Sequence, residues 1–120
     1  MEMTYEITEI QDILVVSIKG KPSVDDIKHI LDHIRNEFGY SHSARLWDFQ
    51  ESSFNFSQNE ILDIASYASA VDSRPSKVAL LVKEDLSFGV SRIYEVFRHT
   101  DLTKTSVFRD KTEALAWLRE

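Results

Sequence analysis

The sequence contains no cysteine. A disulfide framework, a thiolate metal site and a catalytic thiol are therefore excluded. A chain without cysteine suits a reducing compartment, so we expect a cytoplasmic protein. Long apolar runs are also missing, and one of the longest, Val78 to Val82, is far too short to span a membrane. The first ten residues hold no basic segment followed by an apolar one, so we expect no signal peptide.

Clusters of lysine or arginine are absent as well, and the formal net charge is −6. An acidic field repels nucleic acid unless a basic patch overrides it, so we do not expect a nucleic-acid partner. What is present is the composition of a globular protein, with 42% hydrophobic and 28% charged residues in a chain of 120. We therefore expect one domain over residues 1–120.

The first 20 residues predict a β-hairpin. Residues 4–10 alternate between apolar and polar side chains, which is typical of a half-exposed edge strand. Residues 13–19 are almost continuously apolar and rich in β-branched side chains, which favours a strand covered on both faces. Because the link between them is only Gln11-Asp12, the two strands should be antiparallel.

Four helices should alternate with three further strands after the hairpin, and each helix has an apolar stripe at helical spacing. Three of the helices begin with residues that can form a capping box, and these pairs are Ser23 with Asp26, Ser57 with Glu60, and Asp110 with Glu113. We expect Asp85 to cap the remaining helix. The stripe that this helix should bury is Leu86, Val90, Ile93, Tyr94 and Phe97. The three further strands are predicted at residues 44–49, 77–83 and 105–109.

The predicted order of elements is ββαβαβαβα. Strands that alternate with helices need crossover connections, and these give a mostly parallel sheet. We therefore predict an α/β fold with a five-stranded, mostly parallel sheet, an antiparallel N-terminal strand at or near its edge, and four helices.

Two stretches carry a likeness to a known family. One is Arg45-Leu-Trp-Asp48, a strand that ends in Asp and is followed nine residues later by Ser57 at a helix start. The other combines residues 85–92 with residues 107–110 and 114–118. Together with the order of elements, these stretches resemble the STAS/SpoIIAA-like superfamily, the fold of bacterial anti-sigma-factor antagonists, and its STAS/SEC14-like branch in particular. The resemblance implies a SpoIIAA-like fold and a regulatory module that binds protein without catalysis.

Ser57 is a candidate phosphosite through this resemblance. In the antagonists, an Asp-Ser-Ser/Thr-Gly motif at this place carries a serine that a partner kinase phosphorylates, whereas this chain reads Phe56-Ser57-Gln58-Asn59 and keeps only the serine. A hydroxyl at a helix N-terminus lies at the positive end of the helix dipole, which favours an added phosphate. The plainer interpretation is that Ser57 is a preferred N-cap residue, beside which Glu60 would repel a phosphate.

The segment after the third predicted strand is unusually aromatic for a loop, with three phenylalanines in residues 49–56. It leaves the C-terminal end of a strand, where ligands bind in open α/β sheets. The next strand-to-helix junction should lie on the same edge and adds a phenylalanine and an arginine on the polar side of its helix. The candidate binding surface is Phe49, Phe54, Phe56, Phe88 and Arg92. The alternative is that these rings only cover the core.

Other motifs give no chemistry. His29 and His33 have a spacing that can chelate a metal, but they lie on the polar face of a helix without a visible third ligand, so we predict no metal site. Gly89 could let an anion approach the helix amides, yet the spaced glycines and lysine of a phosphate loop are missing, and we predict no cofactor. A hydrolase would need a cleft that joins His99, Asp48 and Ser57. No nucleophile motif supports one, so we predict no catalytic residues and no enzyme activity.

Our first hypothesis is a non-catalytic interaction module. It would recognise a protein, or a second copy of itself, through the edge formed by residues 49–57 and 85–92. The alternative is a module that holds a small apolar or amphipathic, lipid-like molecule under the aromatic loop, as the SEC14-like resemblance would imply.

Overall fold

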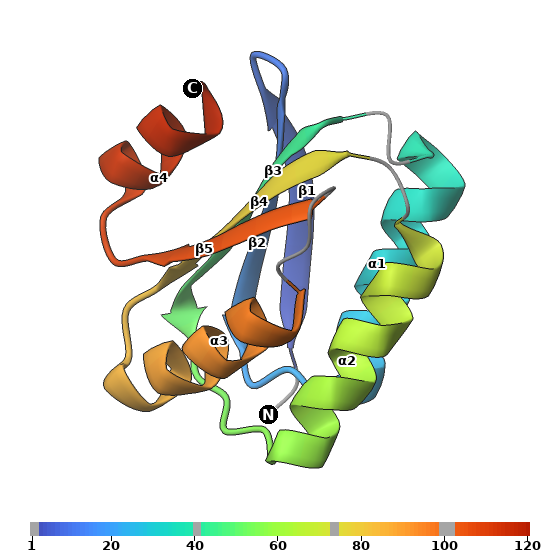
Figure 1. The fold of residues 1–120 in the computed structure, drawn as a ribbon, viewed down its shortest axis with the longest axis vertical. Helices are drawn as coiled ribbons and strands as arrows, with labels where there is room; N and C mark the ends of the chain where they lie inside the picture. Colours follow the sequence, from blue (N-terminus) through green and yellow to red (C-terminus); the bar gives the residue numbers. More distant parts are fainter. Residues whose placement is uncertain (1–2, 40–41, 73–74, 99–102) are drawn as a thin grey trace.

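The computed structural model describes residues 3–39, 42–72, 75–98 and 103–120, and Figure 1 shows its elements in the predicted order ββαβαβαβα. The strands are β1 (Thr4–Ile10), β2 (Ile13–Gly20), β3 (Ala44–Ser52), β4 (Ser76–Val82) and β5 (Thr103–Phe108). The helices are α1 (Val24–Phe38), α2 (Gln58–Val71), α3 (Asp85–Arg98) and α4 (Lys111–Leu118). In the part of the chain that the structure describes, no helix has the length and apolar character needed to cross a membrane.

The five strands form one sheet in the order β1-β2-β3-β4-β5. β1 runs antiparallel to β2 and occupies one edge, and the other three pairings are parallel. Ile10 pairs with Ile13 across the hairpin turn, where Gln11 has a positive φ of 56°. The predicted mixed sheet with an antiparallel edge strand is therefore confirmed.

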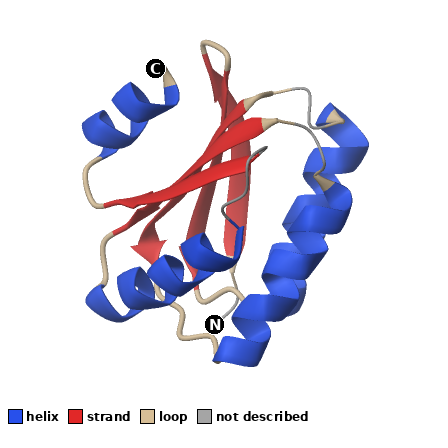
Figure 2. Cartoon of the chain, viewed as in Figure 1, coloured by secondary structure: helices blue, strands red, loops and turns tan. Residues whose placement is uncertain are grey.

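The helices cover the two faces of the sheet unequally (Figure 2). Because β2 to β5 follow one another in a single direction, right-handed crossovers place α1, α2 and α3 on the same face. The larger core cluster lies between these helices and the sheet and includes Leu14, Ile30 and Leu80. α4 packs on the opposite face, where Leu46, Leu81 and Leu118 belong to a smaller cluster.

The helix starts follow local hydrogen-bonding chemistry. Both bonds of the capping box are present at Ser23 with Asp26 and at Ser57 with Glu60, as predicted. At α4, however, the Asp110 side chain accepts from the Thr112 N–H at 3.1 Å, so this cap uses a residue one position earlier than the predicted partner Glu113. Asp85 is the first residue of α3 rather than its cap.

β3 is longer than predicted, because it continues past Phe49 to Ser52. The pairing of β3 with β2 resumes after a register shift, with Lys19 opposite Glu51 and Gly20 opposite Ser52. The Ser52 hydroxyl also donates to the Ile18 carbonyl at 2.6 Å. Phe49 lies inside this strand, two positions from Trp47 and on the same face.

α3 is rotated relative to the predicted stripe. Its buried residues are Ser87, Val90, Ser91 and Arg98. Two members of the predicted apolar stripe face solvent instead, since Leu86 is 55% exposed and Ile93 is 43% exposed. Val96 is 73% exposed on the same side. The predicted stripe is therefore buried only in part: Val90 is buried and Tyr94 and Phe97 are half-buried, whereas Leu86 and Ile93 are exposed because polar partners elsewhere in the fold hold the serine and arginine side of the helix inward.

Candidate functional site

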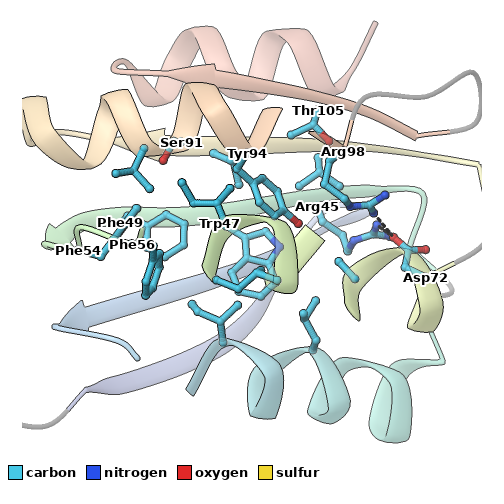
Figure 3. Close-up of a pocket in the computed structure, with 18 residues that line it drawn as sticks. Arg45, Trp47, Phe49, Phe54, Phe56, Asp72, Ser91, Tyr94, Arg98 and Thr105 are labelled. Atoms are coloured by element: carbon cyan, nitrogen blue, oxygen red, sulfur yellow. Dashed lines mark hydrogen bonds and ion pairs between the residues drawn. The ribbon is translucent and has the colours of Figure 1, made fainter. Parts of the chain in front are cut away.

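A partly open cavity of about 70 Å³ lies between the sheet and the three helices on its larger face. Its two ends differ in chemistry (Figure 3). One end is lined by the rings of Phe49, Phe54 and Phe56, and the other by a charged group, with Trp47 and Tyr94 between them.

The aromatic end is a chain of ring contacts. The ring centroids of Trp47 and Phe49 are 6.2 Å apart, and those of Phe49 and Phe54 are 5.0 Å apart at 66°. Phe54 stacks in turn on Phe56 with centroids 5.3 Å apart. Trp47 and Phe49 are buried strand residues, while Phe54 and Phe56 are half-buried in the segment that follows. These rings extend from the core to the surface.

Ser87 fastens the aromatic segment to the first turn of α3. Its hydroxyl accepts from the Phe54 N–H at 2.9 Å and lies 2.9 Å from the Phe54 carbonyl oxygen, to which it can donate. The Glu84 carboxylate is a second acceptor 3.0 Å away. Ser87 is fully buried, so a small polar side chain satisfies backbone groups that would otherwise lack partners in the interior.

The charged end joins three elements. Arg45 comes from the start of β3, Asp72 is the C-cap residue of α2, and Arg98 is the last residue of α3. All three side chains are at most 5% exposed. Burial of charge is tolerated only with partners, and here two guanidinium groups share one carboxylate.

The two arginines of this cluster are held differently. Arg45 is bonded to Asp72 Oδ2, and it donates to the His42 carbonyl at 2.9 Å and to Ser76 Oγ at 3.1 Å. Arg98 makes longer contacts, with Nη1 3.4 Å from Ser69 Oγ and Nη2 3.6 Å from Asp72 Oδ2, and the Tyr94 hydroxyl is a further hydrogen-bond partner. Burial raises the pKa of the Tyr94 phenol beside them, although Arg98 acts in the opposite direction. The Tyr94 hydroxyl therefore stays protonated around neutral pH.

The structure brings together only part of the predicted binding surface. Phe49 is 6% exposed and lies in the core, so it is not a surface residue. Phe54 and Phe56 join it in the cavity wall. Phe88 is half-buried, with the Arg109 guanidinium 4.2 Å from its ring centroid. Arg92 is exposed and pairs with Glu95 at 3.1 Å.

The other candidates are placed as follows. Ser57 is exposed and makes both bonds of its capping box, and its phosphorylation stays a prediction. His33 Nδ1 is 2.6 Å from the Tyr5 hydroxyl, and its Nε2 is 2.5 Å from a Glu37 carboxylate oxygen. Within residues 3–39, 42–72, 75–98 and 103–120, no three His, Cys, Asp or Glu side chains are grouped to hold a metal. His99 lies outside the described residues.

Sequence reasoning missed the charged end of the cavity. One signal was available, because Arg45, Trp47 and Phe49 are alternate residues of one strand and must share a face. By the same alternation, Asp48 faces away from the cavity, on the side of Leu46. The positions of Asp72 and Arg98 depend on how helices pack, which no local pattern gives.

Comparisons with known proteins concern the fold. No family model and no curated protein matches the sequence. Solved structures do match almost the whole chain. One is an uncharacterized protein from the DUF3478 family of Shewanella loihica, described as having a SpoIIAA-like fold, with 20% identity and a TM-score of 0.62 over 97% of this chain and 93% of that chain.

Two other similar structures are anti-sigma factor antagonists. The protein from Mycobacterium paratuberculosis has 13% identity and a TM-score of 0.72 over 99% of this chain and 96% of that chain. SpoIIAA in its unphosphorylated form has 16% identity and a TM-score of 0.61 over 97% and 96%. Because these identities are low, the likeness shows the fold alone, and the chain has the SpoIIAA-like fold that the sequence resemblance implied.

Proposed function

We propose that this chain is a non-catalytic regulatory module that binds another protein through the outer face of α3. The observation that carries the proposal is an apolar stripe on that face which the domain itself does not cover. Leu86, Ile93 and Val96 are all large apolar side chains that are exposed by 43% or more. Apolar residues gathered on one exposed helix face are typical of interaction sites.

The spacing of the stripe fits helix-to-helix packing. Leu86, Gly89, Ile93 and Val96 follow one another at intervals of three, four and three residues, which is the spacing of a coiled-coil seam. At 100° per residue these positions fall within about 80° of one another on the helix. They lie opposite the buried Ser91, and the Leu86 edge of the seam borders the buried Val90.

Gly89 supports this interpretation. Glycine within a helix costs up to about 1 kcal/mol relative to alanine. A Cβ atom added at Gly89 would meet nothing within 4 Å, so packing inside the domain does not require glycine there. Because Gly89 has no side chain, it leaves space on the outer face of the helix. The backbone of a partner helix can approach closely there.

The partner that fits is an amphipathic helix of a different protein. Helices of this kind place apolar side chains at the same three- and four-residue spacing. A second copy of the chain would bring a further net charge of −6 to the interface and repel the first, whereas a basic partner would be attracted. A regulatory role is consistent with the fold, because two of the similar structures are anti-sigma factor antagonists.

Site-specific cross-linking in cells tests the proposal. p-Benzoylphenylalanine placed at Val96 should give one discrete cross-linked product, and the additional change Ile93→Asp should remove it. The same photoreactive residue at Ala116, which is exposed on α4 at the opposite face, is the matched control. Two outcomes would exclude this docking face. One is the same set of cross-linked products from positions 96 and 116, and the other is a cross-linked product at position 96 that is still formed when the chain is folded and carries Ile93→Asp. A product with twice the mass of the chain would identify self-association instead.

A further inference from the structure

The β1 edge of the sheet leads to an inference that does not depend on the outer face of α3. β1 is the first strand in the sheet order, so β2 pairs with one of its sides, and no strand of the described residues pairs with the other. We propose that this outer side binds an extended, basic segment of a partner protein, which joins the sheet as a further strand. Strand addition of this kind takes its affinity from main-chain hydrogen bonds.

The hairpin determines which backbone groups a partner strand can use. In a two-residue hairpin, the pair that closes the turn exchanges hydrogen bonds, and bonded and non-bonded pairs alternate along the ladder from there. Ile10 and Ile13 close this turn, and the pairing of β1 with β2 continues to the start of β1 without a register shift. The N–H and C=O groups of Tyr5, Ile7 and Glu9 therefore point to the outer side.

β1 lacks several of the features that usually protect an edge strand. Natural proteins protect such strands with proline, lysine, a β-bulge or a very short length. Residues 4–10 contain neither proline nor lysine, and the strand is seven residues long with continuous pairing. α1 lies over one face of β1, where the Tyr5 ring contacts His29 and His33. The exposed side chains of β1 are Thr4, Glu6, Thr8 and Glu9.

The charges around β1 favour a basic partner. Tyr5 packs against the larger core cluster, so it lies on the face that α1 covers. By alternation, Glu9 shares this face and Glu6 lies on the opposite one. Glu37 is exposed near the end of α1 and lies 2.5 Å from His33, which contacts the Tyr5 hydroxyl at 2.6 Å. A strand added to β1 would therefore meet acidic side chains on both faces.

The same glutamates disfavour a second copy of the chain at this edge. Two β1 strands that paired with each other would place Glu6 and Glu9 of both copies in one short ladder. Like charges on neighbouring strands are destabilising. Lysine or arginine side chains of a partner strand would instead form opposite-charge pairs with these carboxylates, which contribute about 0.2–1 kcal/mol each.

Hydrogen exchange measured by NMR tests the proposed strand addition. The probe is the peptide Lys-Val-Val-Lys-Val-Val-Lys, blocked at both ends, which matches the length of β1 and places lysines on both faces of a strand. With the free peptide at ten times its dissociation constant, exchange at the Tyr5, Ile7 and Glu9 amides should slow about tenfold.

Two control peptides separate strand addition from charge attraction. Lys-Pro-Pro-Lys-Pro-Pro-Lys carries the same charge, but its prolines remove ladder donors on both of its edges, so it should not protect these amides. Glu-Val-Val-Glu-Val-Val-Glu keeps the valines and reverses the charge, so repulsion should prevent it from binding.

Two variants of the chain locate the binding on β1. Ile7→Pro removes one outward N–H, and proline is tolerated in an edge strand where its N–H would face solvent. Ile7→Ala also loses the packing of the side chain but keeps the N–H, so it is the matched control. Ile7→Pro should bind the Lys-Val peptide about tenfold or more weakly than Ile7→Ala.

Glu6→Lys keeps the test decisive if Ile7→Pro does not fold. It should weaken binding of the Lys-Val peptide, whereas Glu113→Lys, an equal change of charge at an exposed position of α4, should not. The proposal would be overturned by no protection from the Lys-Val peptide, by equal protection from the Lys-Pro peptide, or by equal binding to Glu6→Lys and Glu113→Lys. Protection of the same three amides by self-association, without any peptide, would assign the edge to a second copy and overturn it as well.

Discussion

Asp72→Asn should be among the most destabilising single changes in this protein. The substitution keeps the shape of the side chain but removes the one negative charge between two buried guanidinium groups. Breaking a buried ion pair from one side costs about 3–5 kcal/mol, because the remaining charge is left without compensation. The loss is a large fraction of the roughly 5–15 kcal/mol by which domains of this size are stable.

Urea unfolding, followed by circular dichroism, measures this loss. With a denaturant slope of about 1–3 kcal/mol per molar, the midpoint should fall by at least about 1 M while the slope stays the same. Asp63→Asn is the matched control, because Asp63 pairs with Lys28 at 2.9 Å but is 53% exposed. An exposed pair of this kind contributes about 0–1 kcal/mol.

A second change separates charge from packing. If the cost of Asp72→Asn comes from uncompensated charge, adding Arg98→Met should recover part of the lost stability, because it removes one of the two stranded cations. Equal midpoints for Asp72→Asn and Asp63→Asn would refute the reasoning, since they would mean that the cluster is hydrated and not a desolvated ion group.

Three further outcomes follow from the contacts. Ser87→Ala should cost about 1–3 kcal/mol, because the Phe54 N–H loses its buried acceptor, and hydrogen exchange at Phe54 should accelerate; unchanged exchange would contradict this. Ser57→Ala should cost about 1 kcal/mol through loss of the cap, and Ser57→Asp, which can also cap, should retain most of the stability when both are measured by thermal melting. The raised pKa of Tyr94 means that its neutral form favours the fold, so this contribution is complete below pH 10 and is lost as pH rises toward the folded-state pKa. Tyr94→Phe should therefore reduce the loss of stability at alkaline pH. A stability profile against pH that is the same in Tyr94→Phe and the natural chain would contradict this prediction.

The fold was predictable from sequence because its signals are local and repeated. Alternating and continuous apolar runs separated β1 from β2, and the capping boxes at Ser23 and Ser57 marked two helix starts that the structure confirms. The order of strands and helices then left few topologies, since crossover connections have one hand. The sequence resemblance to the STAS/SpoIIAA-like superfamily implied the same arrangement, and the similar solved structures confirm the fold.

The orientation of α3 was not predictable in this way. The usual rule that apolar side chains are buried predicts that Leu86 and Ile93 face the core. The helix instead buries Ser87 and Arg98. The partners that hold these two polar residues inward are the backbone of Phe54 and the carboxylate of Asp72, which lie 33 and 26 residues earlier in the chain. Contacts between residues so far apart in the chain produce no periodic pattern in the sequence from which they could be predicted.

The candidate site was predicted in part for a related reason. The three phenylalanines of residues 49–56 were recognised as unusual, and they do gather at one cavity. Phe49, predicted both as the last strand residue and as the first residue of the aromatic segment, is a buried strand residue, and the further extension of β3 to Ser52 depends on pairing with β2 across a register shift. The arginines were not predicted, because each is isolated in sequence and they meet only through folding.

Cysteine footprinting tests the central claim, that a partner covers the outer face of α3, most directly. The natural chain has no cysteine, so Val96→Cys and Ala116→Cys each introduce a single thiol. A maleimide should label both thiols rapidly in the purified protein, and in intact cells it should spare the thiol at 96 while still labelling the one at 116. Equal labelling of the two thiols in cells would contradict the account.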